Sequence, residues 1–153
     1  MLNKVFRFGG VYTVFIHWED IFPTRKQIGD RDIGLPEGTG DAIYFEILTA
    51  QIEELLSLSG PAPDLVFFNA GVDPHGEDRL GKLALSDGGL ARRDALIIGA
   101  CAERGLPVAC VVGGGCARDT MSLAQWHGLL YAAADHCYRN LVGGFRENSS
   151  SLR

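Results

Sequence analysis

The sequence predicts an α/β fold built on a mainly parallel sheet. Three short apolar segments, residues 11–18, 65–68 and 107–112, each run into glycine or polar residues, as buried parallel strands do. The longer stretches between and after them repeat apolar residues at helical spacing. A chain of 153 residues with 46% apolar content has the size of one domain and enough apolar side chains for a core.

The first expected strand, residues 11–18, is rich in β-branched and aromatic residues, so we expect it to be buried on both faces. It carries His17 near its end and leads into a polar loop longer than a simple connection requires. Two interpretations of His17 are open: a residue of a functional site, or a strand-end histidine with a satisfied hydrogen bond.

Three helices are expected, each with its own start and stop signals. The first begins near Asp41, an N-capping residue type, and ends before the Gly-Pro step at residues 60–61. The second covers residues 90–104, between the second and third strands. This strand–helix–strand order predicts a parallel pair. The third runs from residues 119–120 to about residue 139.

The carboxyl ends of parallel strands lie along one edge of a sheet, where open α/β proteins bind their ligands. Three expected strand ends therefore bring His17, Asp73 with His75, and the turn at residues 113–116 to one place. Asp73 and His75 suit a metal site or an acid–base pair, although an Asp-Pro step also opens ordinary turns. A zinc site needs three or four protein ligands, which one strand end cannot supply.

The turn at residues 113–116 reads Gly-Gly-Gly-Cys between a strand and a helix. Backbone N–H groups at such a place can bind a phosphate or an oxyanion, but the turn lacks the Lys-Ser/Thr of a P-loop and the spacing of a dinucleotide-binding fingerprint. A tight turn without a ligand is the other interpretation. Cys116 is a candidate nucleophile if a base lies within hydrogen-bond reach, and an inert thiol otherwise.

The composition argues against several classes of function. A net charge of −5 without a run of Lys or Arg argues against general nucleic-acid binding and against binding to an anionic membrane surface. The apolar stretch near the amino terminus is too short for a secretory signal or a membrane span. The four cysteines form no C-x-x-C pair, so reduced thiols in a cytoplasmic or nuclear protein are expected.

Four segments resemble the carboxyl-terminal half of zinc-dependent histone deacetylases, and look most like the class IV and bacterial members. They read FIHWEDIFPTRK, DIGLPEGTGDAIY, PDLVFFNAGVDPHGEDRLGKLALSDGGLARRD and GLPVACVVGGGC, and they follow the family's order over most of residues 10–140. The resemblance implies a three-layer αβα arginase/deacetylase fold, incomplete here because the amino-terminal half is missing. It also implies hydrolysis of acetyl-lysine amides by a zinc-activated water.

The same resemblance assigns roles to individual positions. Asp73 matches the second zinc-binding aspartate of the family. Phe22 and Leu80 look like the apolar residues on two walls of the acyl-lysine tunnel. Gly114 and Gly115 match the glycine turn that precedes the family's catalytic tyrosine, which donates a hydrogen bond to the developing oxyanion.

Two departures from the family pattern predict an impaired enzyme. Cys116 stands in the position of the tyrosine, and a thiol is a poor donor; losing one oxyanion donor costs a factor of about 100 to 1,000 in rate. The family's adjacent His-His pair and its Asp-x-His zinc ligands have no counterpart among His17, His75, His127 and His136. Because one carboxylate does not hold a catalytic zinc ion, we expect this chain alone not to bind zinc stably.

The expected protein is a histone deacetylase-like domain at residues 1–145, followed by a polar, frayed tail at residues 146–153. The substrate that the family implies is acetylated lysine. Because the first strand would lack its neighbours, we expect an exposed sheet edge that favours association with a partner or another copy. A non-catalytic interaction module and a phosphate-binding α/β protein are the alternative functions.

Overall fold

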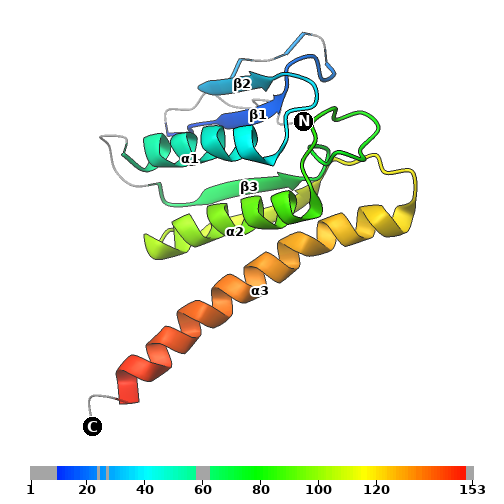
Figure 1. Cartoon of the computed structure of the whole chain (residues 1–153). Coiled ribbons are helices and arrows are strands. Elements are labelled where there is room, and N and C mark those ends of the chain that lie inside the picture. The colour runs from blue at the N-terminus through cyan, green and yellow to red at the C-terminus, as the bar shows by residue number, and fades with distance from the viewer. Residues whose placement is uncertain (1–9, 24, 27, 58–62, 151–153) are drawn as a thin grey trace.

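A computed structural model describes residues 10–23, 25–26, 28–57 and 63–150 of the chain. The elements follow the order β1 (Val14–Trp18), β2 (Arg31–Leu35), α1 (Asp41–Ser57), β3 (Val66–Gly71), α2 (Asp87–Glu103), β4 (Val108–Gly113) and α3 (Thr120–Ser150). Figure 1 shows the strands and helices stacked in layers, with α2 beside β3 and α3 running along α2. This arrangement confirms the predicted α/β class.

The described strands form two parallel pairs rather than one sheet: β1 pairs with β2, and β3 pairs with β4. The prediction that three strand ends share one edge is therefore wrong for β1. Its neighbour β2 lies in a segment that the sequence analysis treats as loop and turn. The sequence of β2 is Arg-Asp-Ile-Gly-Leu, with three residues exposed, so it gives neither an apolar run nor a strict alternation.

Three strands are less buried than their apolar sequences suggest. In β1 only His17 is buried, which corrects the expectation of a strand covered on both faces. In β3 Phe67 is 61% exposed, and in β4 Val111, which lies on the same face of the pair, is 38% exposed. By contrast, Phe68 of β3 and Cys110 of β4 pack into an apolar cluster with α2 and α3. One face of the β3–β4 pair is thus covered by helices, while the other carries exposed apolar side chains.

Two clusters of buried apolar residues hold the layers together. The larger one consists of Leu35, Tyr44, Phe45, Leu48, Val72, Leu83, Leu85, Leu90 and Trp126. The smaller one joins β3, α2 and α3 through Ala70, Ile98, Leu130 and Ala133. Because fully burying one large apolar side chain contributes about 1.5–3 kcal/mol, these clusters are the main source of stability. They contain the apolar faces that helical spacing predicts for all three helices.

The starts of α1 and α2 are bonded to each other. Ser86 is the N-cap of α2, and its hydroxyl oxygen accepts a hydrogen bond from the Gly89 N–H at 2.9 Å. The Asp41 carboxylate accepts hydrogen bonds from the Ser86 N–H at 3.1 Å and the Ser86 hydroxyl at 2.7 Å. Asp41 therefore stabilises the start of the neighbouring helix. The predicted stop of α1 at residues 60–61 lies outside the described residues.

Helix α3 is longer than the sequence analysis predicts. It starts where the Asp119 carboxylate accepts hydrogen bonds from the N–H groups of Met121 and Ser122, both at 2.9 Å. It continues to Ser150 and so includes part of the segment expected to be a frayed tail, whose last three residues lie outside the described ranges. Neither α3 nor any other helix in the described ranges is long and apolar enough to cross a membrane.

Candidate functional site

The candidate site lies where β3 and β4 end side by side. The two strands stay in register up to Gly71 and Gly113, and the Val72 N–H then donates a hydrogen bond to the Gly113 carbonyl oxygen at 3.1 Å. This pairing brings Asp73 next to the glycine turn at residues 113–116, as parallel strand ends predict. The two predicted segments of the site are therefore brought together, whereas His17 sits at the end of the other strand pair.

The Asp73 side chain is packed against glycine backbone. A Cβ atom on Gly71 would lie 2.8 Å from the Asp73 Oδ1 atom, and one on Gly114 would lie closer still. Gly114 and Gly115 also have φ angles of 61° and 96°, the left-handed region that favours glycine. At Gly114 glycine is therefore required both by backbone conformation and by the space that the carboxylate occupies, whereas a Cβ atom on Gly115 would meet the side chains of Val72 and Leu123.

The environment of Asp73 favours its neutral form. Burial raises the pKa of the Asp73 carboxyl, and the nearby Asp78 carboxylate adds to this rise, while a backbone hydrogen bond and the Arg93 guanidinium oppose it. The carboxylate thus lacks the full set of charge partners that a buried anion needs. A cation bound next to Asp73 would reverse this effect, because opposite charge favours the ionised form.

The Asp78 side chain links the loop after β3 to the turn after β4 by hydrogen bonds. Its side chain is buried, and its Oδ1 atom accepts hydrogen bonds from the N–H groups of Leu80 at 2.8 Å and Gly81 at 2.7 Å. Its Oδ2 atom accepts a hydrogen bond from the Cys116 N–H. One buried carboxylate therefore takes up three backbone donors from both segments of the site, and sequence reasoning did not assign it this role.

Arg79 binds the other polar groups of Cys116. Its backbone N–H and its Nε–H donate hydrogen bonds to the Cys116 carbonyl oxygen at 3.3 Å and 3.2 Å. Its Nη2 atom lies 3.0 Å from the Cys116 Sγ atom. Among the described residues, the hydrogen-bond partner of the half-buried thiol is thus the Arg79 guanidinium group and not a histidine base. The arrangement offers no general base for Cys116 as a nucleophile.

A buried ion pair supports the end of β3 from α2. Arg93 and Asp94 are 3% and 2% exposed, and the Arg93 Nε–H donates to the Asp94 Oδ1 atom at 2.8 Å. The Arg93 Nη1 atom donates to the Gly71 carbonyl oxygen at 2.6 Å, two residues before Asp73. Burial raises the pKa of Asp94, and the charge of Arg93 opposes that rise. The signal in the sequence was an adjacent Arg-Asp pair within an otherwise apolar helical face.

The two histidines at strand ends both have structural partners. The His75 Nδ1 atom accepts a hydrogen bond from the Glu77 N–H at 3.1 Å, and its Nε2 atom lies 3.1 Å from the Asp87 carboxylate. Its ring packs on Trp126 with a centroid distance of 4.0 Å. The His17 Nδ1 atom lies 2.6 Å from the Trp18 carbonyl oxygen, which supports the strand-end interpretation of this residue.

The residues matched to the tunnel walls are both exposed. Phe22 is 76% exposed and Leu80 is 64% exposed, which is unusual for large apolar side chains. Phe22 lies in the loop after β1, and Leu80 lies in the loop after β3. Their role in a tunnel stays a prediction, as do the roles of Gly114, Gly115 and Cys116.

The described residues do not form a metal site by themselves. Among them, no three side chains of His, Cys, Asp or Glu come together in a way that could hold a metal ion. Asp73 supplies one carboxylate, and both ring nitrogens of His75 already have partners. Catalytic zinc requires about three protein ligands and an open position, so these residues do not fit such an ion.

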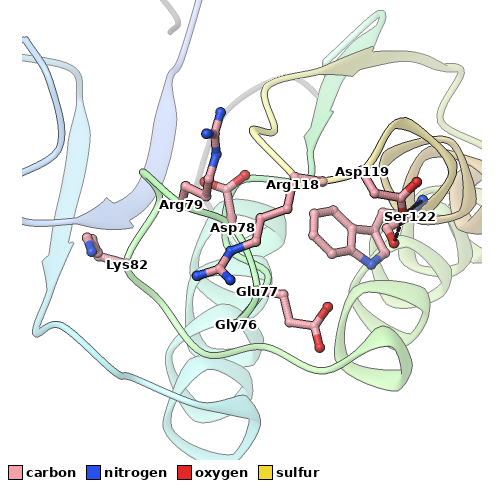
Figure 2. A pocket seen from close by; sticks show the side chains of 10 residues that line it. Gly76, Glu77, Asp78, Arg79, Lys82, Arg118, Asp119 and Ser122 are labelled. Carbon is pink, nitrogen blue, oxygen red and sulfur yellow. Dashed lines mark hydrogen bonds between the residues drawn. The ribbon is translucent and has the colours of Figure 1, made fainter.

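A polar pocket of about 770 Å³ opens beside the site. It is lined by the loop after β3, with Gly76, Glu77, Asp78, Arg79 and Lys82, and by the start of α3, with Ala117, Arg118, Asp119, Ser122 and Trp126. Figure 2 shows charged side chains of both signs around it, with the Asp119 carboxylate bonded to Ser122. Asp73 is not part of its lining.

Comparison with known proteins agrees with the sequence pattern. The family described as "Histone deacetylase domain" matches residues 8–131 of this chain. An uncharacterized protein of Picosynechococcus sp. (strain PCC 7002) is 49% identical over 128 residues, which are 84% of this chain and 42% of that protein. This chain therefore spans less than half of the relative's length.

Solved structures share the fold. The crystal structure of an HDAC homolog from Aquifex aeolicus matches with a TM-score of 0.59 and 21% identity, over 86% of this chain and 35% of that chain. The structure of an HDAC homolog complexed with SAHA matches with the same TM-score, identity and coverage. At this level of identity the likeness establishes the arginase/deacetylase type of fold and nothing finer.

Proposed function

Because the chain belongs to the histone deacetylase domain family, we propose that it is a deacetylase-like polypeptide whose own residues neither hold a catalytic zinc ion nor hydrolyse acetyl-lysine. The family uses zinc to activate water, and its substrates are acetylated lysines. The chain spans 42% of the relative and 35% of the solved homologue, so the activity of a whole enzyme is not carried over to it.

The observation that carries this proposal is the ligand count at Asp73. Asp73 is the one residue of the described site that matches a family zinc ligand, and His75 beside it is occupied by Glu77 and Asp87. A catalytic zinc ion needs about three protein ligands, so a single carboxylate does not keep it bound in water. Without a bound metal or a positioned base, no group in the site deprotonates an attacking water.

The second support is the side chain at position 116. The Cys116 Sγ atom lies 3.0 Å from the Arg79 guanidinium, and a thiol is a weak donor in any case. A tyrosine hydroxyl at this position would extend much further from the backbone. The glycine turn thus resembles the family pattern in sequence, while the side chain that follows it does not supply a good oxyanion donor.

The test is an acetyl-lysine hydrolysis assay with the purified chain and added zinc, compared with the Asp73→Ala variant. We expect no turnover above the rate of the variant. Turnover that Asp73→Ala abolishes would refute the proposal. A trace activity that is equal in both proteins would come from contamination and agrees with the proposal.

An interaction module is the second candidate, and exposed apolar residues favour it. Phe67, Val111 and Val112 on the β3–β4 pair are 61%, 38% and 46% exposed, and no further strand of the described residues pairs with the outer edges of β3 and β4. Such surfaces favour pairing with another chain. Light scattering across a concentration series tests this role: growth in mass supports it, and a constant monomer mass counts against it.

A phosphate site on the glycine turn is not favoured. The Asp73 carboxylate lies against Gly114, and the Cys116 N–H is already bonded to Asp78. Two acidic side chains next to the turn would repel a phosphate, and fewer N–H groups are left to bind it. The turn fits close packing against Asp73 better than anion binding.

A further inference from the structure

We propose that Asp78 and Arg79 are positioning residues that fix residue 116 relative to Asp73. We call these two residues the 116 clamp. The proposal rests on the proposed function in taking position 116 as the place of the family's catalytic side chain. It goes further by assigning a task to two residues outside the matched metal and tunnel positions.

The first argument is that the clamp binds every polar group of residue 116. Asp78 accepts the Cys116 N–H, and Arg79 donates twice to the Cys116 carbonyl oxygen, at 3.2 Å and 3.3 Å. The Arg79 Nη2 atom also reaches the Cys116 Sγ atom at 3.0 Å. Because the N–H and the carbonyl belong to the backbone, those bonds do not depend on which side chain stands at position 116.

The second argument is that the clamp is itself fixed. The Asp78 side chain is buried and also accepts the N–H groups of Leu80 and Gly81 at 2.8 Å and 2.7 Å. A Cβ atom on Gly81 would overlap the Asp73 carbonyl oxygen, so the backbones at residues 81 and 73 are in direct contact. The same short loop therefore touches Asp73 at one end and residue 116 at the other.

The third argument is the conformation of the turn. Gly114 and Gly115 adopt φ angles of 61° and 96°. Because glycine has wide backbone freedom, these two residues alone do not fix the position of residue 116, and bonds from outside the turn are needed. Hydrogen bonds with a charged partner are stronger than neutral ones, and both clamp side chains are charged. The clamp therefore gives residue 116 a defined position, which the two glycines before it do not.

The test is the rate of alkylation of Cys116 in the full chain, measured by mass spectrometry after timed exposure to iodoacetamide. Cys137, half-buried on α3, serves as an internal reference thiol. We compare the wild type with Arg79→Lys and Asp78→Asn. Lysine keeps the positive charge of Arg79 but lacks its planar fork, so a change reports lost geometry rather than lost charge.

We expect both variants to alkylate Cys116 about tenfold faster than the wild type, with the Cys137 rate unchanged. If Asp78→Asn does not fold, Arg79→Lys decides alone, because the Arg79 side chain is exposed and its replacement leaves the core intact. A folded variant that alkylates Cys116 at the wild-type rate would overturn the proposal. Zinc-dependent turnover by the chain would contradict the proposed function, yet it would leave this result unaffected.

Discussion

The two parallel strand pairs of the molecule end in different ways. At the end of β3–β4, polar groups from two loops and from α2 converge: Asp73 packs on glycine, Asp78 and Arg79 bind Cys116, and Arg93 supports Gly71. At the end of β1–β2, His17 bonds to its own neighbour and Phe22 is exposed. The comparison shows that the end of β3–β4 carries a connected group of polar side chains, while the end of β1–β2 carries a locally bonded histidine and an exposed aromatic residue.

The largest loss of stability should follow from breaking the Arg93–Asp94 ion pair beneath β3. Replacing Arg93 with Met would leave the buried Asp94 charge uncompensated, so we expect a loss of about 3–5 kcal/mol in the free energy of unfolding. Arg31 on β2 is the matched control, because it pairs with Glu54 in a partly exposed position and Arg31→Met should cost less than about 1 kcal/mol. Urea denaturation measures both. Equal losses would contradict the claim that the buried ion pair beneath β3 contributes more to stability than the partly exposed pair on β2.

Close packing of the loop after β3 should give the second largest effect. A Cβ atom on Gly81 would overlap the Asp73 carbonyl oxygen, so Gly81→Ala forces the backbone apart and should cost about 2–3 kcal/mol. Gly38, in the loop after β2, has a φ of 77° but open space around it, so Gly38→Ala should cost only about 1 kcal/mol. Thermal melting compares them, and a reversed order would contradict the packing argument.

The uncovered face of β3–β4 offers a way to separate association from stability. Phe67 is exposed, so Phe67→Ser should change the free energy of unfolding by no more than about 0.5 kcal/mol. The same change should weaken any self-association seen by sedimentation at high concentration. Phe68→Ser, on the covered face, is the control and should destabilise the fold clearly. Unaltered association in Phe67→Ser would show that this face is not the contact surface.

The smallest effect concerns the start of α3. Hydrogen bonds from Ser122 and Met121 hold the pKa of Asp119 below its ordinary value of 3.8. A lowered folded-state pKa means that Asp119 stabilises the fold above pH 3.8, and that this contribution is lost as the pH falls through the folded-state pKa. Asp119→Ala should therefore melt below the wild type at pH 7, and the difference in melting temperature should narrow as the pH falls below 3.8. A difference in melting temperature between the two proteins that does not depend on pH would contradict this account.

Much of the fold follows from local patterns. Helical spacing predicted the faces that carry Tyr44, Leu90 and Leu130, and the parallel pairing of β3 with β4 followed from strand–helix–strand order. Strand β2 could not be predicted, because Arg31–Leu35 is short, mostly exposed and interrupted by glycine. Its pairing with β1 depends on tertiary contacts that periodicity does not encode.

The site was predictable only in part. Asp73 and the glycine turn could be placed together because parallel strand ends meet. The roles of Asp78 and Arg79 depend on which backbone donors and acceptors the loops present, and sequence spacing does not show this. Likewise, the sequence left His75 open as a possible ligand, and only the positions of Glu77 and Asp87 assign both its nitrogens.

The central claim is that Asp73 is a solitary metal ligand in this chain. Equilibrium dialysis of the purified chain against micromolar zinc, with Asp73→Ala alongside, tests it most directly. We expect no tightly bound zinc that depends on Asp73, and identical isotherms for the two proteins. One zinc ion per chain that is lost in Asp73→Ala would contradict the account, because it would require further ligands that converge on Asp73.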